Sequence, residues 1–179
     1  MELALPLLFV RLVIGLAFAA HGAQKLFGWF GGYGIAGTGG FFETLGFHPG
    51  RVFAAAAGFS EFVGGLLIAA GLFGPVGPMF VIAAMLVAVV TVHLRNGFFA
   101  ASNGVELPLL YLLIALVYAF AGYGALSLDG AFGLAPVWTS AIIWGVVILG
   151  FVGGALNLAV RRKSPAAPPA APETLDPAV

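Results

Sequence analysis

The sequence predicts an all-helical membrane protein, and two observations support this prediction. Hydrophobic residues occupy 61% of the 179 positions and charged residues only 8%, whereas a soluble domain carries roughly 25% charged residues. Five apolar segments approach or exceed the length that a helix needs to cross about 30 Å of hydrocarbon. These two features make the lipid bilayer the expected partner. The formal net charge is zero, so we expect no nucleic acid as a partner. The predicted spans are residues 3–23, 52–72, 76–94, 107–123 and 136–160.

The first segment, residues 3–23, also has some features of a signal peptide, because Ala-Phe-Ala at positions 17–19 resembles a cleavage site. Two charged residues oppose that interpretation. Glu2 stands where a signal peptide carries positive charge, and Arg11 interrupts the apolar stretch. We therefore predict that this segment is a retained spanning helix.

The last apolar segment, residues 136–160, leaves two arrangements open. In one it is a fifth spanning helix that follows the shortest span, residues 107–123. In the other, four segments span the membrane and the last is a peripheral or separate helix. We expect residues 1–163 to form one membrane domain. The Pro- and Ala-rich residues 164–179 are expected to be a disordered cytoplasmic tail, because they contain too few large apolar residues to form a core.

Lys and Arg residues predict how the helices are oriented. Lys25 and Arg51 lie in the first connection, Arg95 lies in the third, and residues 161–163 are all basic. The second and fourth connections contain no Lys or Arg. Because cytoplasmic loops carry an excess of these residues, we predict an N-terminus outside the cell and a C-terminus in the cytoplasm.

The glycine-rich stretch at residues 30–40 matches a nucleotide-binding pattern, since Gly32, Gly34 and Gly37 fit G-x-G-x-x-G. A dinucleotide site also needs a preceding strand and an acidic residue about 20 positions later. Here a membrane helix precedes the glycines, so we interpret the stretch as a tightly turning cytoplasmic connection. Aromatic residues suited to the membrane interface surround it: Trp29, Phe30, Tyr33, Phe41, Phe42 and Phe47.

Ionisable residues inside the spans predict a polar pocket, because such residues face the bundle interior and find partners there. At 1.5 Å per residue, Arg11 lies roughly 9 Å inside the outer boundary and Glu61 lies near the midplane. We therefore predict an Arg11–Glu61 contact above a layer formed by His21 and His93. A structural ion pair and two satisfied histidines are the alternatives to a chemical role. The expected pocket mouth is formed by Lys25, Arg95 and Glu106.

Three smaller features have structural interpretations. Asn103 and Glu106 have the spacing of a capping box, which predicts a helix start. Asp129 is interpreted as a turn residue in an outer connection. The Gly64-Gly65 pair predicts a close approach between helices. The chain has no cysteine and no His spacing typical of metal ligands, so we expect no metal site.

The order of several short motifs resembles the DoxX family of small bacterial membrane proteins. The match runs from about Arg11 to Gly130 and is carried by "HGAQKLFGWFGG", "FFETLGFHPG", "EFVGGLLIAAG", "NGVELPLL" and "GYGALSLDG". The resemblance implies a four-helix bundle in the bacterial inner membrane, to which residues 136–160 would add a fifth helix. Some members of the family are quinone-linked subunits of thiosulfate-oxidising systems, and others are membrane partners in redox or thiol-stress complexes.

The resemblance and the polar residues together predict a subunit or membrane anchor of a redox system, with a redox protein as its partner. If the protein is catalytic, it would be a quinone-linked oxidoreductase subunit. Glu61, His21 and His93 are the candidate catalytic residues, and the headgroup pocket is assigned to Arg11, Lys25, Arg95 and Glu106.

A quinone is the candidate ligand of this pocket. We expect no intrinsic cofactor, and we disfavour ligation of haem b by paired histidines because that requires close ring geometry. The alternative function is a non-enzymatic scaffold, a lipid-binding protein or a small-solute transport bundle.

Overall fold

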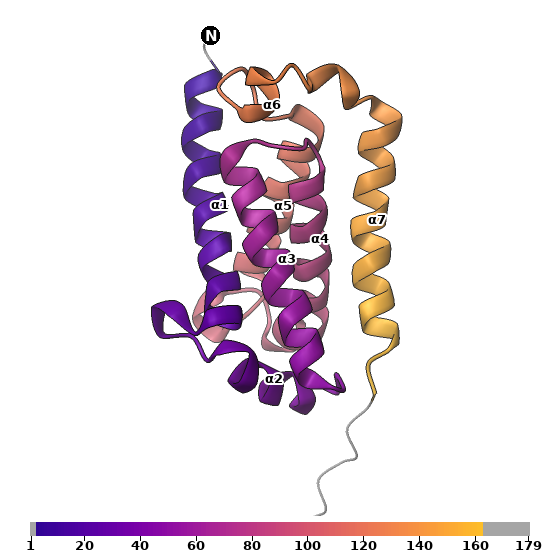
Figure 1. Ribbon diagram of the computed structural model, residues 1–179. Helices are drawn as coiled ribbons and strands as arrows, with labels where there is room; N and C mark the ends of the chain where they lie inside the picture. Colours follow the sequence, from indigo (N-terminus) through magenta and orange to yellow (C-terminus); the bar gives the residue numbers. More distant parts are fainter. Residues whose placement is uncertain (1–2, 163–179) are drawn as a thin grey trace, which may run out of the picture.

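The structure, a computed structural model, describes residues 3–162 and is built from helices and loops, with no strand in that range (Figure 1). The predicted tail, residues 164–179, lies outside the described residues. The α-helices are α1 (Ala4–Phe27), α2 (Gly34–Thr44), α3 (Gly50–Ala70), α4 (Val76–Ala88), α5 (Glu106–Ala121), α6 (Leu128–Ala131) and α7 (Ser140–Ala159). Shorter turns of other helical types are Trp29–Gly31, Val89–His93, Leu94–Asn96, Ala100–Ser102 and Ala135–Val137.

Four helical segments are long and apolar enough to cross a membrane: α1, α3, α7 and the continuous stretch Val76–Asn96. This confirms the predicted all-helical membrane bundle, and α7 corresponds to the predicted segment at residues 136–160. Helix α5 has 16 residues, which gives it a length of about 24 Å. It is the shortest of the five predicted spans, as expected from the sequence.

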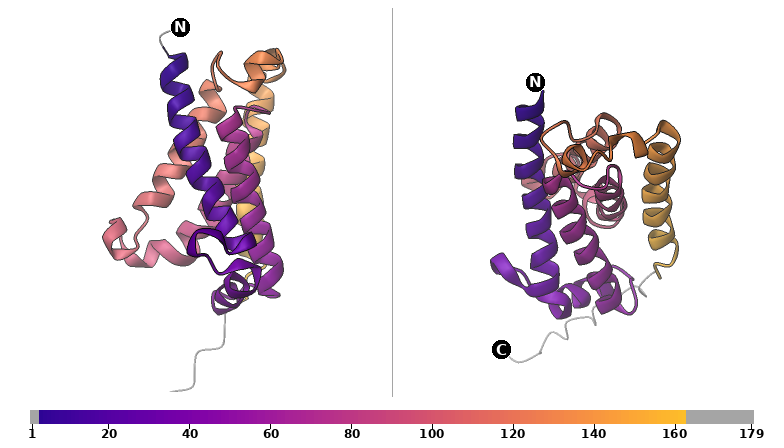
Figure 2. Two further views of the ribbon diagram at one scale, coloured as in Figure 1. Left: turned by 60° about the vertical axis from the view of Figure 1, so that its left-hand side comes forward. Right: turned by 45° about the horizontal axis from the view of Figure 1, so that its top comes forward.

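Helices α1, α3, α4, α5 and α7 run alternately in opposite directions along the bundle (Figure 1). Helix α1 packs on α3, α3 packs on α4, and α4 packs on both α5 and α7. Helix α7 therefore stands on the far side of the bundle from α1 (Figures 1 and 2). We call the two ends of the bundle the α2 end and the α6 end, after the short helices that lie there.

The α2 end contains most of the positive charge. Of the six Lys and Arg residues within residues 3–162, all except Arg11 lie there, at the tip of α1, the start of α3, the end of the α4 segment and the end of α7. The fold thus brings together the basic residues on which the orientation prediction depends. The five are Lys25, Arg51, Arg95, Arg161 and Arg162.

Opposed glycines bring α1 and α3 into backbone contact. A Cβ atom on Gly65 would lie 2.5 Å from the Gly15 carbonyl oxygen, and one on Gly22 would lie 2.6 Å from the Gly58 carbonyl oxygen. The glycines on each helix are seven residues apart and therefore share one face. Gly64, next in sequence to Gly65, faces α4 instead, where its Cβ would lie 3.1 Å from the Gly77 carbonyl oxygen. The predicted close approach at Gly64-Gly65 is thus confirmed for two different helices.

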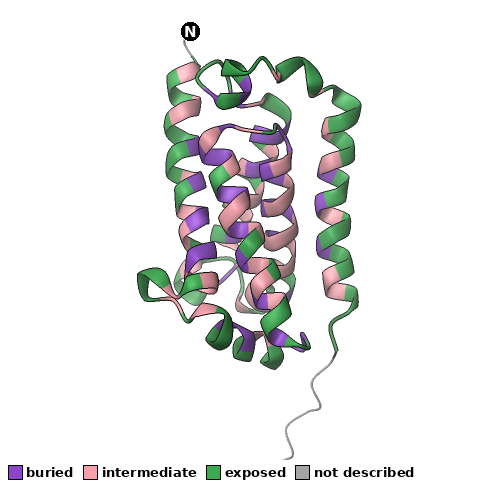
Figure 3. Cartoon of the chain, viewed as in Figure 1, coloured by how far each residue is buried: buried purple, intermediate pink, exposed green. Residues whose placement is uncertain are grey.

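The packed core occupies the half of the bundle nearer the α6 end, and large apolar side chains cover the outside. Figure 3 shows buried positions on the inner faces of α1, α3 and α4 and a largely exposed α7. Exposed side chains such as Phe9, Leu16 and Leu149 have lipid as their expected solvent. The core consists of Phe18, Ile68, Val81, Ile82, Met85, Ala115, Tyr118, Ala119, Tyr123 and Val147.

The end of α7 is attached to the loop between α2 and α3. The Arg161 Nε donates a hydrogen bond to the Leu45 carbonyl oxygen. The Arg162 backbone N–H donates to the Gly46 carbonyl oxygen over 2.8 Å. Gly46 has φ +92°, and a Cβ there would lie 1.9 Å from the Arg162 carbonyl oxygen. Only glycine fits at this contact.

We expect Gly46→Ala to detach the end of α7 and to lower the free energy of unfolding by roughly 1–3 kcal/mol. Hydrogen exchange at residues 155–162 should become faster. Gly133→Ala is the matched control, because Gly133 also has positive φ (+65°) but no atom within 4 Å of a Cβ. Equal effects of the two substitutions on α7 exchange would show that the contact at Gly46 does not hold α7.

Candidate functional site

A partly open space of about 380 Å³, which we call the interior cavity, lies in the half of the bundle nearer the α2 end. Its volume is in the range of small-molecule sites. Helices α3 and α4 create the space because they contribute alanines where larger side chains would fill it, for example Ala57, Ala84 and Ala88. Phe18 and Met85 add apolar walls. The main polar side chains on its surface are His21, Lys25, Ser60, Glu61, His93, Tyr111 and Asn157.

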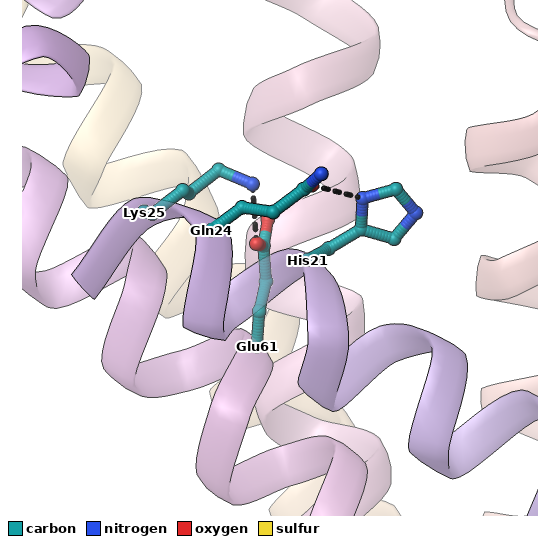
Figure 4. Close-up of polar contacts among 4 residues, drawn as sticks. All are labelled: His21, Gln24, Lys25 and Glu61. Carbon is teal, nitrogen blue, oxygen red and sulfur yellow. Dashed lines mark hydrogen bonds and ion pairs between the residues drawn. The ribbon is translucent and has the colours of Figure 1, made fainter. Parts of the chain in front are cut away.

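An ion pair between Lys25 and Glu61 forms part of the cavity wall (Figure 4). The Lys25 ammonium donates to Glu61 Oε2. Exposed fractions of the two side chains are 26% and 7%, so the carboxylate is the more buried partner. The predicted Arg11–Glu61 contact is therefore wrong, because Lys25 is the partner of Glu61.

The register of α1 against α3 explains this correction. The glycine contacts place Gly15 opposite Gly65 and Gly22 opposite Gly58, so Glu61 is level with Ala19. Arg11 is then about 12 Å away along the axis in one direction, and Lys25 is about 9 Å away in the other. Helical side chains tilt toward the N-terminus of their own helix. In this antiparallel pair, Lys25 and Glu61 tilt toward each other, whereas Arg11 tilts away.

Arg11 lies outside the interior cavity, near the α6 end, and binds backbone carbonyls. Its Nε donates to the Ala69 oxygen over 3.1 Å, and its Nη1 donates to the Tyr123 oxygen over 3.0 Å. Its Nη2 donates to the Leu126 oxygen. The last carbonyls of a helix lack partners within that helix, and cations are favoured at a helix C-terminus. Arg11 therefore caps the end of α3 and fixes the chain that follows α5.

His21 lies at the cavity wall beside Tyr111, with the two ring centroids 6.1 Å apart and the rings edge to face. Its Nδ1 is 3.2 Å from Gln24 Oε1. The Gln24 amide is oriented by a second bond, from its Nε2 to the Phe30 carbonyl oxygen. Because an amide oxygen only accepts, His21 Nδ1 is the donor, and Nε2 of the neutral ring is free to accept.

His93 also lines the interior cavity, and its Nδ1 has a similar partner. Its Nδ1 lies 2.8 Å from the Asn103 carbonyl oxygen, which only accepts, so Nε2 of the neutral ring is again left as an acceptor. His93 ends a π-helical stretch, Val89–His93, that follows α4. Such stretches alter the helical phase and often occur at functional sites. The structure thus brings His21, Lys25, Glu61 and His93 to one cavity.

Arg95 and Glu106 do not line the interior cavity. Arg95 is exposed on the turn Leu94–Asn96. The Glu106 carboxylate accepts a hydrogen bond from the Ala100 backbone N–H over 2.8 Å. The predicted helix start is confirmed, because α5 begins at Glu106, but the capping box does not form, because the N-cap is Val105 and not Asn103. Glu106 instead holds together the loop that projects from the side of the bundle (Figure 2).

Asp129 has a larger structural role than the predicted turn. It is 5% exposed, and its carboxylate accepts hydrogen bonds from the backbone N–H groups of Phe73 and Gly74 and from Trp138 Nε1, over 2.7–2.9 Å. These bonds join the α3–α4 connection to the segment before α7. The sequence shows that Asp129 lies in a connection without Lys or Arg, which indicates that its partners are not basic side chains. It does not show which N–H groups donate to the carboxylate.

Comparison with known proteins identifies the family of this bundle. The DoxX family model matches residues 6–94, a range that includes Lys25, Glu61 and His93. The chain belongs to the DoxX family. It is 35% identical over 129 residues to an uncharacterized protein of Haemophilus influenzae, and the match covers 70% of this chain and 90% of that protein. No solved structure matches the chain significantly.

The DoxX match and the apolar helices show that this is a multi-pass membrane protein. The matched range ends after the π-helical stretch, so Tyr111 of α5 and Asn157 of α7 are cavity residues outside it. Among residues 3–162, no three His, Cys, Asp or Glu side chains gather in a way that could hold a metal ion.

Proposed function

We propose that this DoxX protein binds the headgroup of a membrane-soluble quinone in the interior cavity, as a subunit or membrane anchor of a redox system. The observation that supports it best is an ion pair with a buried carboxylate, in the wall of a mainly apolar cavity within a membrane bundle. A quinone headgroup likewise combines an apolar part, its flat ring, with a polar part, its two carbonyl oxygens. Lys25 and Tyr111 carry donors for such oxygens, while Phe18 and Met85 offer surfaces for the ring.

Groups that can carry a proton lie beside the proposed headgroup position in the interior cavity, and they suit the chemistry of quinones. A quinone carbonyl oxygen takes up a proton when the molecule becomes a quinol, so a group that carries a proton is useful next to it. In this proposal Glu61 and His93 have that role, and the electrons come from a partner redox protein. His21, at the exposed edge of the cavity, orients the headgroup.

We further propose that the α2 end faces the cytoplasm, which puts the interior cavity in the cytoplasmic half of the membrane. The support for this orientation is that five of the six described Lys and Arg residues lie at the α2 end. Basic residues are enriched in cytoplasmic loops.

Binding of a short-tailed benzoquinone to the purified protein in lipid nanodiscs, followed by native mass spectrometry, tests the proposed function. We expect one quinone per chain, and we expect Glu61→Gln to weaken binding at least tenfold because Lys25 loses its counter-charge and the proton site is lost. Ser60→Leu, which fills the cavity without altering the ion pair, should have a similar effect. Both variants must elute as folded protein.

Glu106→Gln is the matched control, because Glu106 lies outside the interior cavity and the amide retains an acceptor for the Ala100 N–H. Its quinone affinity should equal that of the wild type. If Glu61→Gln and Ser60→Leu left the affinity unchanged, the quinone would bind elsewhere. If phospholipid bound and quinone did not, the quinone assignment would be wrong and a lipid-binding function would replace it.

A further inference from the structure

The glycine-rich segment encloses a second space, of about 520 Å³, which we call the vestibule. It lies between the tip of α1 and helix α2, at the α2 end of the bundle. The segment folds back so closely that a Cβ on Gly32 would lie 2.4 Å from the backbone of Gln24, whereas a Cβ on Gly31 would meet nothing within 4 Å. The glycines thus permit the fold and leave the space open. The vestibule is lined by Gln24, Gly31, Gly32, Tyr33, Gly37 and Thr38.

Lys25, Phe41 and Phe42 line both the vestibule and the interior cavity. The boundary between the two spaces is therefore formed by one flexible cationic side chain and two aromatic rings. Lys25 crosses this boundary, since it lines the vestibule while its ammonium contacts Glu61 (Figure 4). Gln24 forms a parallel connection, because it bonds to Phe30 in the glycine-rich segment and to His21 at the interior cavity.

The opposite route to Glu61, from the α6 end, is closed by packing. Phe18, Ile82 and Tyr118 are each at most 1% exposed, and the Tyr118 hydroxyl donates to the Leu7 carbonyl oxygen over 2.9 Å. Arg11 and its three carbonyl partners lie beyond them. This packing separates the ion pair from the α6 end, whereas at the α2 end Lys25 itself lines the vestibule.

We propose that the vestibule is an aqueous entrance through which protons reach the Lys25–Glu61 pair from the α2 end. A proton from vestibule water adds to the Glu61 carboxylate, and the resulting carboxylic acid can transfer that proton to a headgroup oxygen in the interior cavity. Only a proton moves in this step, so no electron donor is needed for it. The purpose of the entrance rests on the proposed quinone function, but its existence does not.

Silver ions test the entrance, because they are small, hydrophilic and reactive toward thiols, and because the chain has no native cysteine. Thr38→Cys reports on the vestibule and Ser60→Cys on the interior cavity beside Glu61. Silver nitrate is added to sealed vesicles whose α2 end faces outward or inward, and the remaining thiols are counted by mass spectrometry after denaturation. We expect both variants to react at least tenfold faster from the α2 end.

Filling the vestibule provides the decisive comparison. Thr38→Phe combined with Ser60→Cys should slow the reaction of the Ser60→Cys thiol at least tenfold, and Thr38→Leu, a smaller change, should slow it less. Gly40→Leu on the same helix is the control, since a Cβ at Gly40 meets nothing within 4 Å, and it should have no effect. Ala54→Cys, at a position 0% exposed that lines neither space, should not react.

Two results would overturn the entrance. One is a Ser60→Cys thiol that silver does not reach from the α2 end. The other is a thiol that silver reaches equally fast with and without the Thr38 substitutions. No quinone is present in this experiment, so its outcome is independent of the quinone-binding test. A protein that binds quinone but lacks the entrance, or the reverse, would be recognised as such.

Discussion

Gly65→Val is expected to prevent α1 from packing on α3 and to abolish the folded bundle. A Cβ on Gly65 would lie 2.4 Å from the Ala19 backbone nitrogen and 2.5 Å from the Gly15 carbonyl oxygen. Both atoms belong to a rigid helix, so the two helices must separate. Close packing of small residues is a main source of attraction between helices in lipid. We therefore expect a loss of at least about 3 kcal/mol, at the upper end of overpacking effects.

Gel filtration in mild detergent should show the Gly65→Val protein as aggregated or absent, while Gly145→Val should give a monodisperse peak like the wild type. Gly145 is a suitable control because it also lies in a spanning helix, α7, and a Cβ there meets no atom within 4 Å. A folded and stable Gly65→Val protein would mean that α1 and α3 do not depend on their glycine contact.

Most of the fold could be predicted from the sequence, because the bilayer imposes simple rules on length and composition. The five apolar segments correspond to α1, α3, the α4 segment, α5 and α7. Details decided by backbone geometry were not predictable. The π-helical stretch Val89–His93 has no distinct composition, and α7 begins at Ser140, not at the predicted 136, because a separate turn occupies Ala135–Val137. The bonds from Arg161 and Arg162 to the α2–α3 loop also depend on tertiary structure.

The candidate site was predicted in part. That His21, Lys25, Glu61 and His93 share one polar region followed from their depth along the helices, which needs only the rise per residue. The pairing within that region was wrong, because it depends on how far α1 is shifted relative to α3. Glycine contacts set this shift, and the direction in which side chains tilt then selects Lys25 over Arg11. The glycine-rich segment follows a helix, as predicted, but the sequence could not show that it lines the same vestibule as Lys25.

Arg11→Met is expected to be the most damaging single change near the α6 end. It removes the donors for the carbonyl oxygens of Ala69, Tyr123 and Leu126 and replaces the guanidinium with an apolar chain of similar length. Arg11 is 3% exposed, so water does not readily replace the lost bonds. Leaving a buried acceptor unsatisfied costs roughly 1–3 kcal/mol. With three acceptors affected, the free energy of unfolding should fall by at least about 3 kcal/mol.

Reversible unfolding by sodium dodecyl sulfate in mixed micelles measures this free energy, with Leu12→Met on the lipid-facing side of α1 as the control. Arg11→Lys separates charge from geometry. An ammonium keeps the positive charge near the end of α3 but lacks the planar fork that reaches three carbonyls at once, so the lysine variant should also be less stable than the wild type. If Arg11→Lys matched the wild type, the charge alone would stabilise this end. If the free energy of unfolding of Arg11→Met also equalled that of the wild type, the three carbonyls would not depend on Arg11, and its capping role would be refuted.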